Sequence, residues 1–163
     1  MKLHAYLNYG GNCEEAFRFY EKNLGGKITM MMKQSQLPVQ YNVQPGTENA
    51  VVHARMSIAG VELIANDVPK SDFKPVRSSY LFFALDSSKD ADRVYAVLAE
   101  GGEIGMPIAQ TFFASRFGQL RDRFGTLWTI MECTPKMRQE IKGPITLNGG
   151  EQCLCPDKSI PAN

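Results

Sequence analysis

The chain has 163 residues, of which 44% are hydrophobic and 21% are charged, so it is long enough to bury a substantial core as one domain or two fused half-domains. Its formal net charge of +1 gives neither the basic surface of a nucleic-acid-binding protein nor an acidic tail. No apolar run approaches the roughly 20 residues that cross a bilayer, and the start of the chain lacks the apolar stretch of a signal peptide, so we expect a cytoplasmic protein with no nucleic-acid or membrane partner.

The first third of the chain predicts a strand, a helix and three more strands. The alternating stretch LHAYLNY at 3–9 is typical of a strand, and Asn12 followed by Glu15 resembles a capping box at the start of a helix. The pair Gly25-Gly26 ends this helix. The apolar face of the helix, at helical spacing, consists of Ala16, Phe19, Tyr20 and Leu24. The strands that follow are predicted at 27–33, 50–58 and 61–66, the last two joined by a tight turn at Ala59-Gly60.

The second half of the chain repeats this order. A strand is predicted at 80–86, and Ser87 or Ser88 caps a helix that ends at Gly101-Gly102. The sequence GGKI after the first helix returns as GGEI after the second. Three strands are predicted near 104–112, 115–122 and 126–133. The repeat is therefore βαβββ followed by βαβββ, which predicts a domain of two paired modules.

These elements set the predicted domain boundaries. The first module is expected at 1–67, a linker at 68–79, the second module at 80–134, and a partly extended or disordered C-terminal extension at 135–163. The polar loop at 34–48 is long enough to act as a lid, although a surface excursion explains it equally well. The four cysteines, Cys13, Cys133, Cys153 and Cys155, are too few for a disulfide framework in a chain of this size.

Three separated segments of the chain resemble one known family. They are YLNYGGNCEEAFRFYEKNLGGKI, HARMSIAG and MPIAQTFFASRFGQLRDRFGTLWTIM. They are similar to the PhnB-like branch of the vicinal-oxygen-chelate superfamily, which contains glyoxalase I, extradiol dioxygenases and bleomycin-resistance proteins. The resemblance spans about Met1 to Glu132 and implies an α+β fold in which each βαβββ module curls a mixed sheet into a half-open cup. It implies no single reaction, because members of this fold isomerise, oxidise, transfer thiols or bind drugs.

The resemblance also implies where metal ligands would lie, on the first and last strands of each module. In the first module these positions carry His4 and Glu62, which match the histidine and carboxylate of metal-dependent members. In the second module they carry Tyr80 and Thr129, whose neutral hydroxyls are poor ligands for Zn²⁺, Ni²⁺, Mn²⁺ or Fe²⁺. The other histidine, His53, is on a neighbouring strand, so the implied metal site is incomplete.

Each candidate also has an ordinary structural explanation. Glu62 is either a catalytic base or ligand facing the cup, or a solvated residue on an open sheet face. His4 shares a strand face with Tyr6 and Asn8, which suits either a pocket lining or a hydrogen-bonded surface. His53 and Arg55 share another strand face, where an outward polar face is the simpler interpretation.

Substrate contact is the alternative for the polar strand faces and for several aromatic residues. Arg55, with His53 beside it, could hold a carboxylate or phosphate through two hydrogen bonds. Core packing explains most of the aromatic residues of the second half. If the face of Tyr80 and Phe82 looks into the cup, however, it offers an apolar-aromatic binding surface. The predicted substrate-binding set is Tyr6, His53, Arg55, Tyr80, Phe82, Phe112 and Thr129.

These observations leave three functions open. The first is the binding of a small, partly apolar ligand in an aromatic-lined cup. The second is a metal-dependent lyase, isomerase or dioxygenase with His4 and Glu62 as ligands. The third is a regulatory or interaction module without chemistry. A homodimer is expected in each case, because the resemblance implies cups completed across a two-fold axis and open sheet edges invite pairing.

Overall fold

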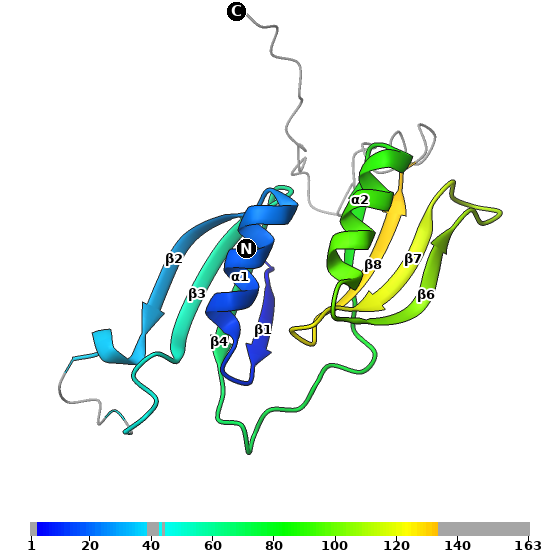
Figure 1. Cartoon of the computed structure of the whole chain (residues 1–163). Helices are drawn as coiled ribbons and strands as arrows, with labels where there is room; N and C mark the ends of the chain where they lie inside the picture. Colours follow the sequence, from blue (N-terminus) through cyan, green and yellow to red (C-terminus); the bar gives the residue numbers. More distant parts are fainter. Residues whose placement is uncertain (1–2, 39–42, 44, 134–163) are drawn as a thin grey trace, which may run out of the picture.

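The structure is a computed structural model that describes residues 3–38, 43 and 45–133 (Figure 1). The predictions for the C-terminal extension, for Cys153 and Cys155 and for the middle of the 34–48 loop lie outside these residues. The first half contains β1 (Ala5–Tyr9), α1 (Cys13–Leu24), β2 (Lys27–Lys33), the short 3-10 helix η1 (Gln34–Gln36), β3 (Val51–Ile58) and β4 (Val61–Asp67). The second half contains β5 (Leu81–Leu85), α2 (Ser88–Ala99), β6 (Glu103–Ala109), β7 (Phe117–Arg121) and β8 (Leu127–Glu132).

Each half of the chain forms one four-stranded mixed sheet. The strand orders are β1-β4-β3-β2 and β5-β8-β7-β6, so the first strand of each half pairs with the last. That pairing is parallel in both sheets, and the other pairings are antiparallel. The predicted fold of two βαβββ modules with curled mixed sheets is confirmed.

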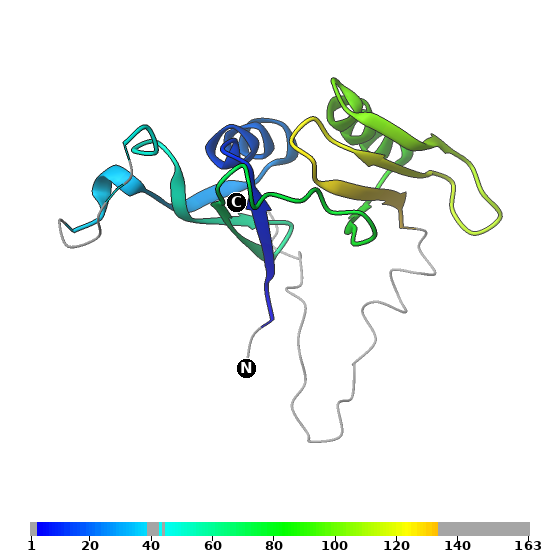
Figure 2. The ribbon, with the colours of Figure 1, turned by 90° about the horizontal axis from the view of Figure 1, so that it is seen from below.

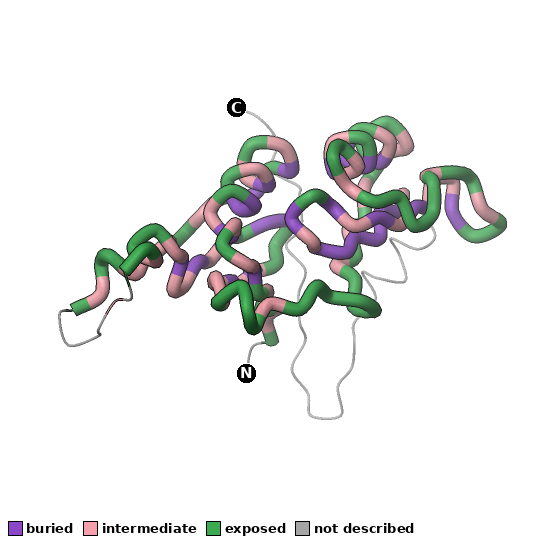
Figure 3. Tube along the Cα trace, turned by 60° about the horizontal axis from the view of Figure 1, so that its bottom comes forward, coloured by how far each residue is buried: buried purple, intermediate pink, exposed green. Residues whose placement is uncertain are grey.

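Both helices lie on the same side of the two sheets (Figure 2). Strand alternation places Ala54 and Met56 of β3 and Leu63 and Ala65 of β4 against α1, and all four side chains are buried. In the second half, Trp128 and Ile130 of β8 are likewise buried and belong to the core cluster. One continuous core cluster joins both halves. Buried residues therefore gather between helices and sheets, whereas exposed residues follow the connection between β4 and β5 (Figure 3).

The N-terminus of α1 is capped from a distant strand. Asn12 occupies the predicted N-cap position, but its side chain makes no capping hydrogen bond, so the predicted capping box is wrong. Asp67, the last residue of β4, accepts instead from the backbone N–H groups of Gly11 and Cys13, both at 3.0 Å. Its second oxygen accepts from Val51 N–H at 2.8 Å. One carboxylate thus pairs with the first N–H of α1 and with an N–H of the loop before it, and ties α1 to β3 and β4.

A buried carboxylate joins the two halves of the chain. Asp122 lies in the turn between β7 and β8 and is 3% exposed. One of its oxygens accepts from the backbone N–H groups of Phe124 at 2.9 Å and Thr126 at 3.0 Å. The other accepts from the hydroxyl of Tyr20, in α1, at 2.5 Å and from Trp128 Nε1 at 2.8 Å. Burial raises the pKa of Asp122, although these four donors act in the opposite direction.

The same seam between the halves carries further contacts. The hydroxyl of Thr126 lies 3.1 Å from that of Tyr9, at the end of β1. The ring of Phe73, from the connection between the modules, lies so close to Gly10 that a Cβ there would approach it to 3.0 Å. Gly125, on the other side of the seam, also faces this ring. The connection is therefore packed against both halves rather than hanging free.

Neither helix in the described part of the chain has the length and apolar character that crossing a bilayer requires.

Candidate functional site

The face of the first sheet that points away from α1 is polar; we call it the first open face. Its residues alternate with the buried ones on β1, β4 and β3. The strand register sets Tyr6 opposite Ile64 and Ile64 opposite Arg55. One step along, Asn8 stands opposite Asn66. The first open face thus comprises His4, Tyr6, Asn8, His53, Arg55, Glu62, Ile64 and Asn66.

An ionic cluster lies at one end of this face. His4 Nε2 is 3.4 Å from Glu62 Oε2, and Arg55 Nη2 is also 3.4 Å from that same oxygen. All three side chains are partly exposed, which screens the attraction among them. The structure therefore brings together three of the residues that the sequence singled out, with Glu62 at the centre.

This cluster does not fit a divalent metal. His4 and Glu62 supply two ligands, and a metal held between them would lie beside the guanidinium cation of Arg55. Within the described residues, no three His, Cys, Asp or Glu side chains come close enough to hold a metal ion. A site with two protein ligands and an adjacent fixed positive charge is a weak one.

The corresponding face of the second sheet mixes aromatic and polar side chains. Phe82, 55% exposed, stands opposite Thr129 on β8, and Thr129 stands opposite Gln119 on β7. Thr129 is buried, and its hydroxyl accepts from Gln119 Nε2 at 3.1 Å. Phe112 is fully exposed, between β6 and β7, with its ring 5.0 Å from that of Phe113. Because the hydroxyl of Thr129 is already hydrogen-bonded to Gln119, the simpler role of Thr129 is to join β8 to β7.

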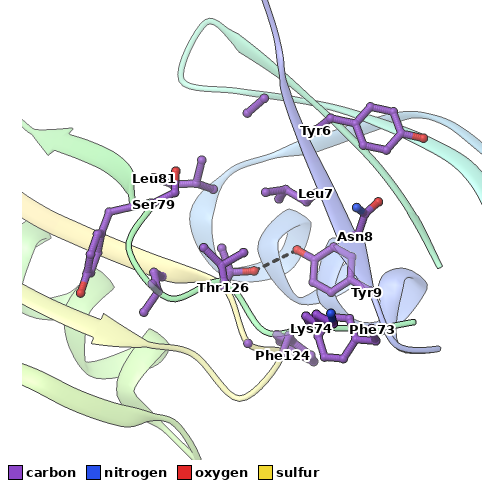
Figure 4. A pocket seen from close by; sticks show the side chains of 15 residues that line it. Tyr6, Leu7, Asn8, Tyr9, Phe73, Lys74, Ser79, Leu81, Phe124 and Thr126 are labelled. Atoms are coloured by element: carbon purple, nitrogen blue, oxygen red, sulfur yellow. Dashed lines mark hydrogen bonds between the residues drawn. The ribbon is translucent and has the colours of Figure 1, made fainter. Parts of the chain in front are cut away.

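A pocket of about 360 Å³ lies at the seam between the two halves; we call it the seam pocket (Figure 4). Its walls come from β1, from the connection between β4 and β5, and from the turn that leads into β8. Leu7 and Tyr9 point from β1 toward Phe124 and Thr126, and the Tyr9–Thr126 hydrogen bond spans the space between these walls. The lining residues are Ala5–Tyr9, Phe73, Lys74, Val76, Ser79–Leu81 and Phe124–Leu127.

Only two of the predicted site residues, Tyr6 and Tyr80, belong to the seam pocket lining. Tyr6 points from β1 to the side opposite Leu7, so it lies at the border of the pocket and the first open face (Figure 4). No hydrogen bond or ion pair in the described part of the chain joins the pair His4 and Glu62 to Tyr80 or Thr129.

Sequence reasoning missed the pocket walls contributed by the connection. Residues 68–79 have the composition of a linker, and their prolines and charged residues do not predict a contact with the rest of the chain. One signal was present, since Phe73 is the single aromatic residue in that stretch and is flanked by charged residues. An aromatic side chain in an otherwise polar connection often marks a contact with the body of the protein.

Known proteins of one family are similar to this chain in sequence and in structure. The family that matches residues 2–130 is the Glyoxalase/Bleomycin resistance protein/Dioxygenase superfamily. Protein YjdN of Escherichia coli (strain K12) is 31% identical over 144 residues, covering 80% of this chain and 94% of that protein. Protein PA1353 from Pseudomonas aeruginosa has a solved structure that is 31% identical, with a TM-score of 0.73 over 81% of this chain and 97% of its own. The PhnB protein from Bacillus cereus is 26% identical, with a TM-score of 0.71 over 82% and 100% of the two chains.

Proposed function

Because this chain belongs to the glyoxalase/bleomycin resistance protein/dioxygenase superfamily, we propose that it binds a small, partly apolar organic molecule, with the seam pocket as the binding site. The observation that carries the proposal is the pocket itself. Its volume of about 360 Å³ is within the range typical of ligand sites. A module that served only as an interaction surface would fill such a space with its own side chains.

The chemistry of the lining suits a ligand with an apolar body and a few polar groups. Leu7, Phe73 and Phe124 offer apolar and aromatic surface. Lys74 and Ser79, from the connection, add an ammonium group and a hydroxyl. Burial raises the pKa of Tyr9 well above its ordinary value, so its hydroxyl stays neutral and acts as a hydrogen-bonding group rather than an acid.

A pocket-filling substitution tests this proposal. Ser79→Trp places an indole in the seam pocket, and we expect it to weaken binding of the fluorescent apolar anion 1-anilinonaphthalene-8-sulfonate at least tenfold. Ser71→Trp is the matched control, because Ser71 lies in the same connection but outside the pocket lining, and it should leave the affinity unchanged. A fluorescence titration measures both. Equal affinity of the two variants would place the dye elsewhere and remove the seam pocket as the binding site.

A metal-dependent reaction is the second candidate, and the contact between His4 and Glu62 is the observation in its favour. The adjacent Arg55 argues against it, so we expect far less than one equivalent of Zn, Ni, Mn or Fe in protein purified without chelator or added metal. Elemental analysis provides the measurement. The metal-dependent reaction would become the favoured function if the protein contained one equivalent of metal. That metal must disappear in Glu62→Gln and in His4→Gln, and it must persist in the control His53→Gln.

The proposal also takes the protein to be a cytoplasmic homodimer. Large apolar side chains on the second sheet and beside it are exposed, among them Phe82, Ile104 and Met106. Exposed apolar side chains of this kind, at the two edges of the second sheet, are candidates for the contact between two copies. The buried Cys13, whose pKa burial raises far above the ordinary value for a thiol, suits a reducing compartment in which thiols carry no structural bond.

A further inference from the structure

A second pocket, of about 190 Å³, adjoins the seam pocket; we call it the arginine pocket. Tyr80 and Leu127 line both pockets, so the two share a wall. The arginine pocket is also lined by Arg77, from the connection between β4 and β5, and by Arg121, from β7. Arg121 Nη1 donates to the carbonyl oxygen of Gly125 at 3.3 Å, and Gly125 belongs to the seam pocket lining. The guanidinium of Arg121 therefore lies at the border of the two pockets.

The strand register explains why Arg121 faces this pocket. Arg121 stands opposite Leu127 on β8 and opposite Glu103 on β6, so the three lie in one row across the sheet. Strand alternation puts this row on the same face as Gln119 and Thr129. That face is turned away from α2, because the alternate residues of β8 belong to the core cluster. A cation in this row is thus open to a ligand.

The positive charges around the arginine pocket are poorly compensated. Arg77 is exposed and has no hydrogen-bond or ion-pair partner within the described residues. Arg121 Nε is 3.5 Å from Glu103 Oε2, whereas a strong charge-assisted hydrogen bond is about 2.8 Å. The Glu103 side chain is 82% exposed, so water screens this ion pair. Lys74 is the one charged residue in the described lining of the seam pocket, and it adds a further positive charge.

These features suit an oxyanion. A guanidinium group offers two parallel N–H donors to a carboxylate or a phosphate. The volume of about 190 Å³ is far above the roughly 15 Å³ that a single water molecule needs, so such a group fits. An oxyanion in the arginine pocket meets two guanidinium groups and displaces only one weak ion pair.

We propose that the arginine pocket binds an oxyanion of the ligand whose apolar body occupies the seam pocket. This inference rests on the proposed function and narrows it to apolar molecules that carry a carboxylate, phosphate or sulfonate group. The oxyanion accepts hydrogen bonds from Arg77 and Arg121. Tyr80 and Leu127 contact the part of the ligand that passes from one pocket into the other.

Two dyes that differ in a single group test the proposal in fluorescence titrations of the full chain. They are 1-anilinonaphthalene-8-sulfonate and N-phenyl-1-naphthylamine, which has the same rings without the sulfonate. Arg77→Gln and Arg121→Gln should each weaken binding of the sulfonate dye at least fivefold and leave the neutral dye unchanged. The control Arg18→Gln removes an exposed arginine of α1 and should alter neither affinity.

Glu103→Gln provides a test that a folding defect cannot imitate. The substitution removes the carboxylate that competes for Arg121, so the sulfonate dye should bind about threefold more tightly, with the neutral dye unchanged. Displacement of the sulfonate dye by 1-naphthyl phosphate and by 1-naphthoate then identifies the preferred oxyanion. The neutral 1-naphthol should displace it more weakly than either. Should Arg121→Gln not fold, Arg77→Gln and Glu103→Gln test the two cations.

The outcomes separate this site from the proposed function. If Ser79→Trp weakens both dyes but neither arginine variant weakens the sulfonate dye, the seam pocket binds apolar molecules and the arginine pocket has no part in it. Equal weakening of both dyes in the arginine variants would show a change of pocket shape rather than a loss of charge, and would also overturn the site. If Ser79→Trp changes neither dye, the proposed function fails, and this inference fails with it.

Discussion

Asp122→Ala is expected to lower the free energy of unfolding by about 3–5 kcal/mol. The substitution removes the acceptor of four donors at once, in a site that is 3% exposed. Trp128 Nε1 and two backbone N–H groups cannot act as acceptors, so they stay buried and unpaired. Urea unfolding followed by circular dichroism measures the loss.

Asp122→Asn should cost less than the alanine substitution. Its remaining oxygen can still accept from Phe124 N–H and Thr126 N–H, but its NH₂ group faces the N–H of Trp128. The control Asp72→Asn changes an exposed carboxylate that pairs with Ser71, and it should alter stability by no more than about 0.5 kcal/mol. Equal stability of Asp122→Ala and Asp72→Asn would show that the buried network contributes nothing.

The pH dependence of the same variants checks the role of burial. Because burial raises the pKa of Asp122, the folded chain holds this proton to a higher pH than the unfolded chain does. The stability that comes from the protonated carboxyl is therefore complete below about pH 4 and is lost as the pH rises through the raised pKa. The advantage of the unchanged chain over Asp122→Asn should shrink as the pH rises above about 4. An advantage that grows over this range would contradict the raised pKa.

Gly102→Ala is expected to destabilise the chain by about 3 kcal/mol. A Cβ at this position would lie 2.3 Å from the backbone oxygen of Arg121 and 3.2 Å from that of Leu98. Backbone atoms cannot move aside as a side chain can, so the turn after α2 must separate from β7. The reason is steric, because the backbone of Gly102 is not in the left-handed region.

The repeat provides a matched control in Gly26, the residue that corresponds to Gly102 in the first module. A Cβ at Gly26 would meet Met56 Sδ at 2.7 Å, and a methionine side chain can change rotamer. Gly26→Ala should therefore cost only about 1 kcal/mol. The fluorescence of Trp128, the single tryptophan, follows urea unfolding in both variants. Equal losses would mean that the second turn is as adaptable as the first.

The fold was predictable because its determinants are local and occur twice. Apolar residues at helical spacing, strand alternation and the two glycine pairs each act within a few residues of the chain. The alternation also predicted correctly that His53 and Arg55 share one face of β3, opposite Ala54 and Met56. The same signals placed the N-cap of α2 at Ser87 or Ser88, and in the structure it is Ser87, whose hydroxyl accepts from Asp90 N–H at 3.1 Å.

The contacts that hold the modules together could not be predicted, because they join residues far apart in sequence. Asp67 caps a helix more than 50 residues earlier, and Asp122 accepts from Tyr20 across 102 residues. Nothing in the neighbouring sequence of either aspartate identifies its partner. The seam pocket was missed for the same reason, since its walls come from three segments that meet only in the folded chain.

The hydrogen bond from Tyr20 to Asp122 couples the unfolding of the two halves of the chain. A fragment with only one βαβββ copy would carry either the donor or the acceptor of this bond, never both, and would leave its half of the seam in water. Loss of structure in one half therefore removes the partner of a buried group in the other, so we expect the two halves to melt in a single cooperative event.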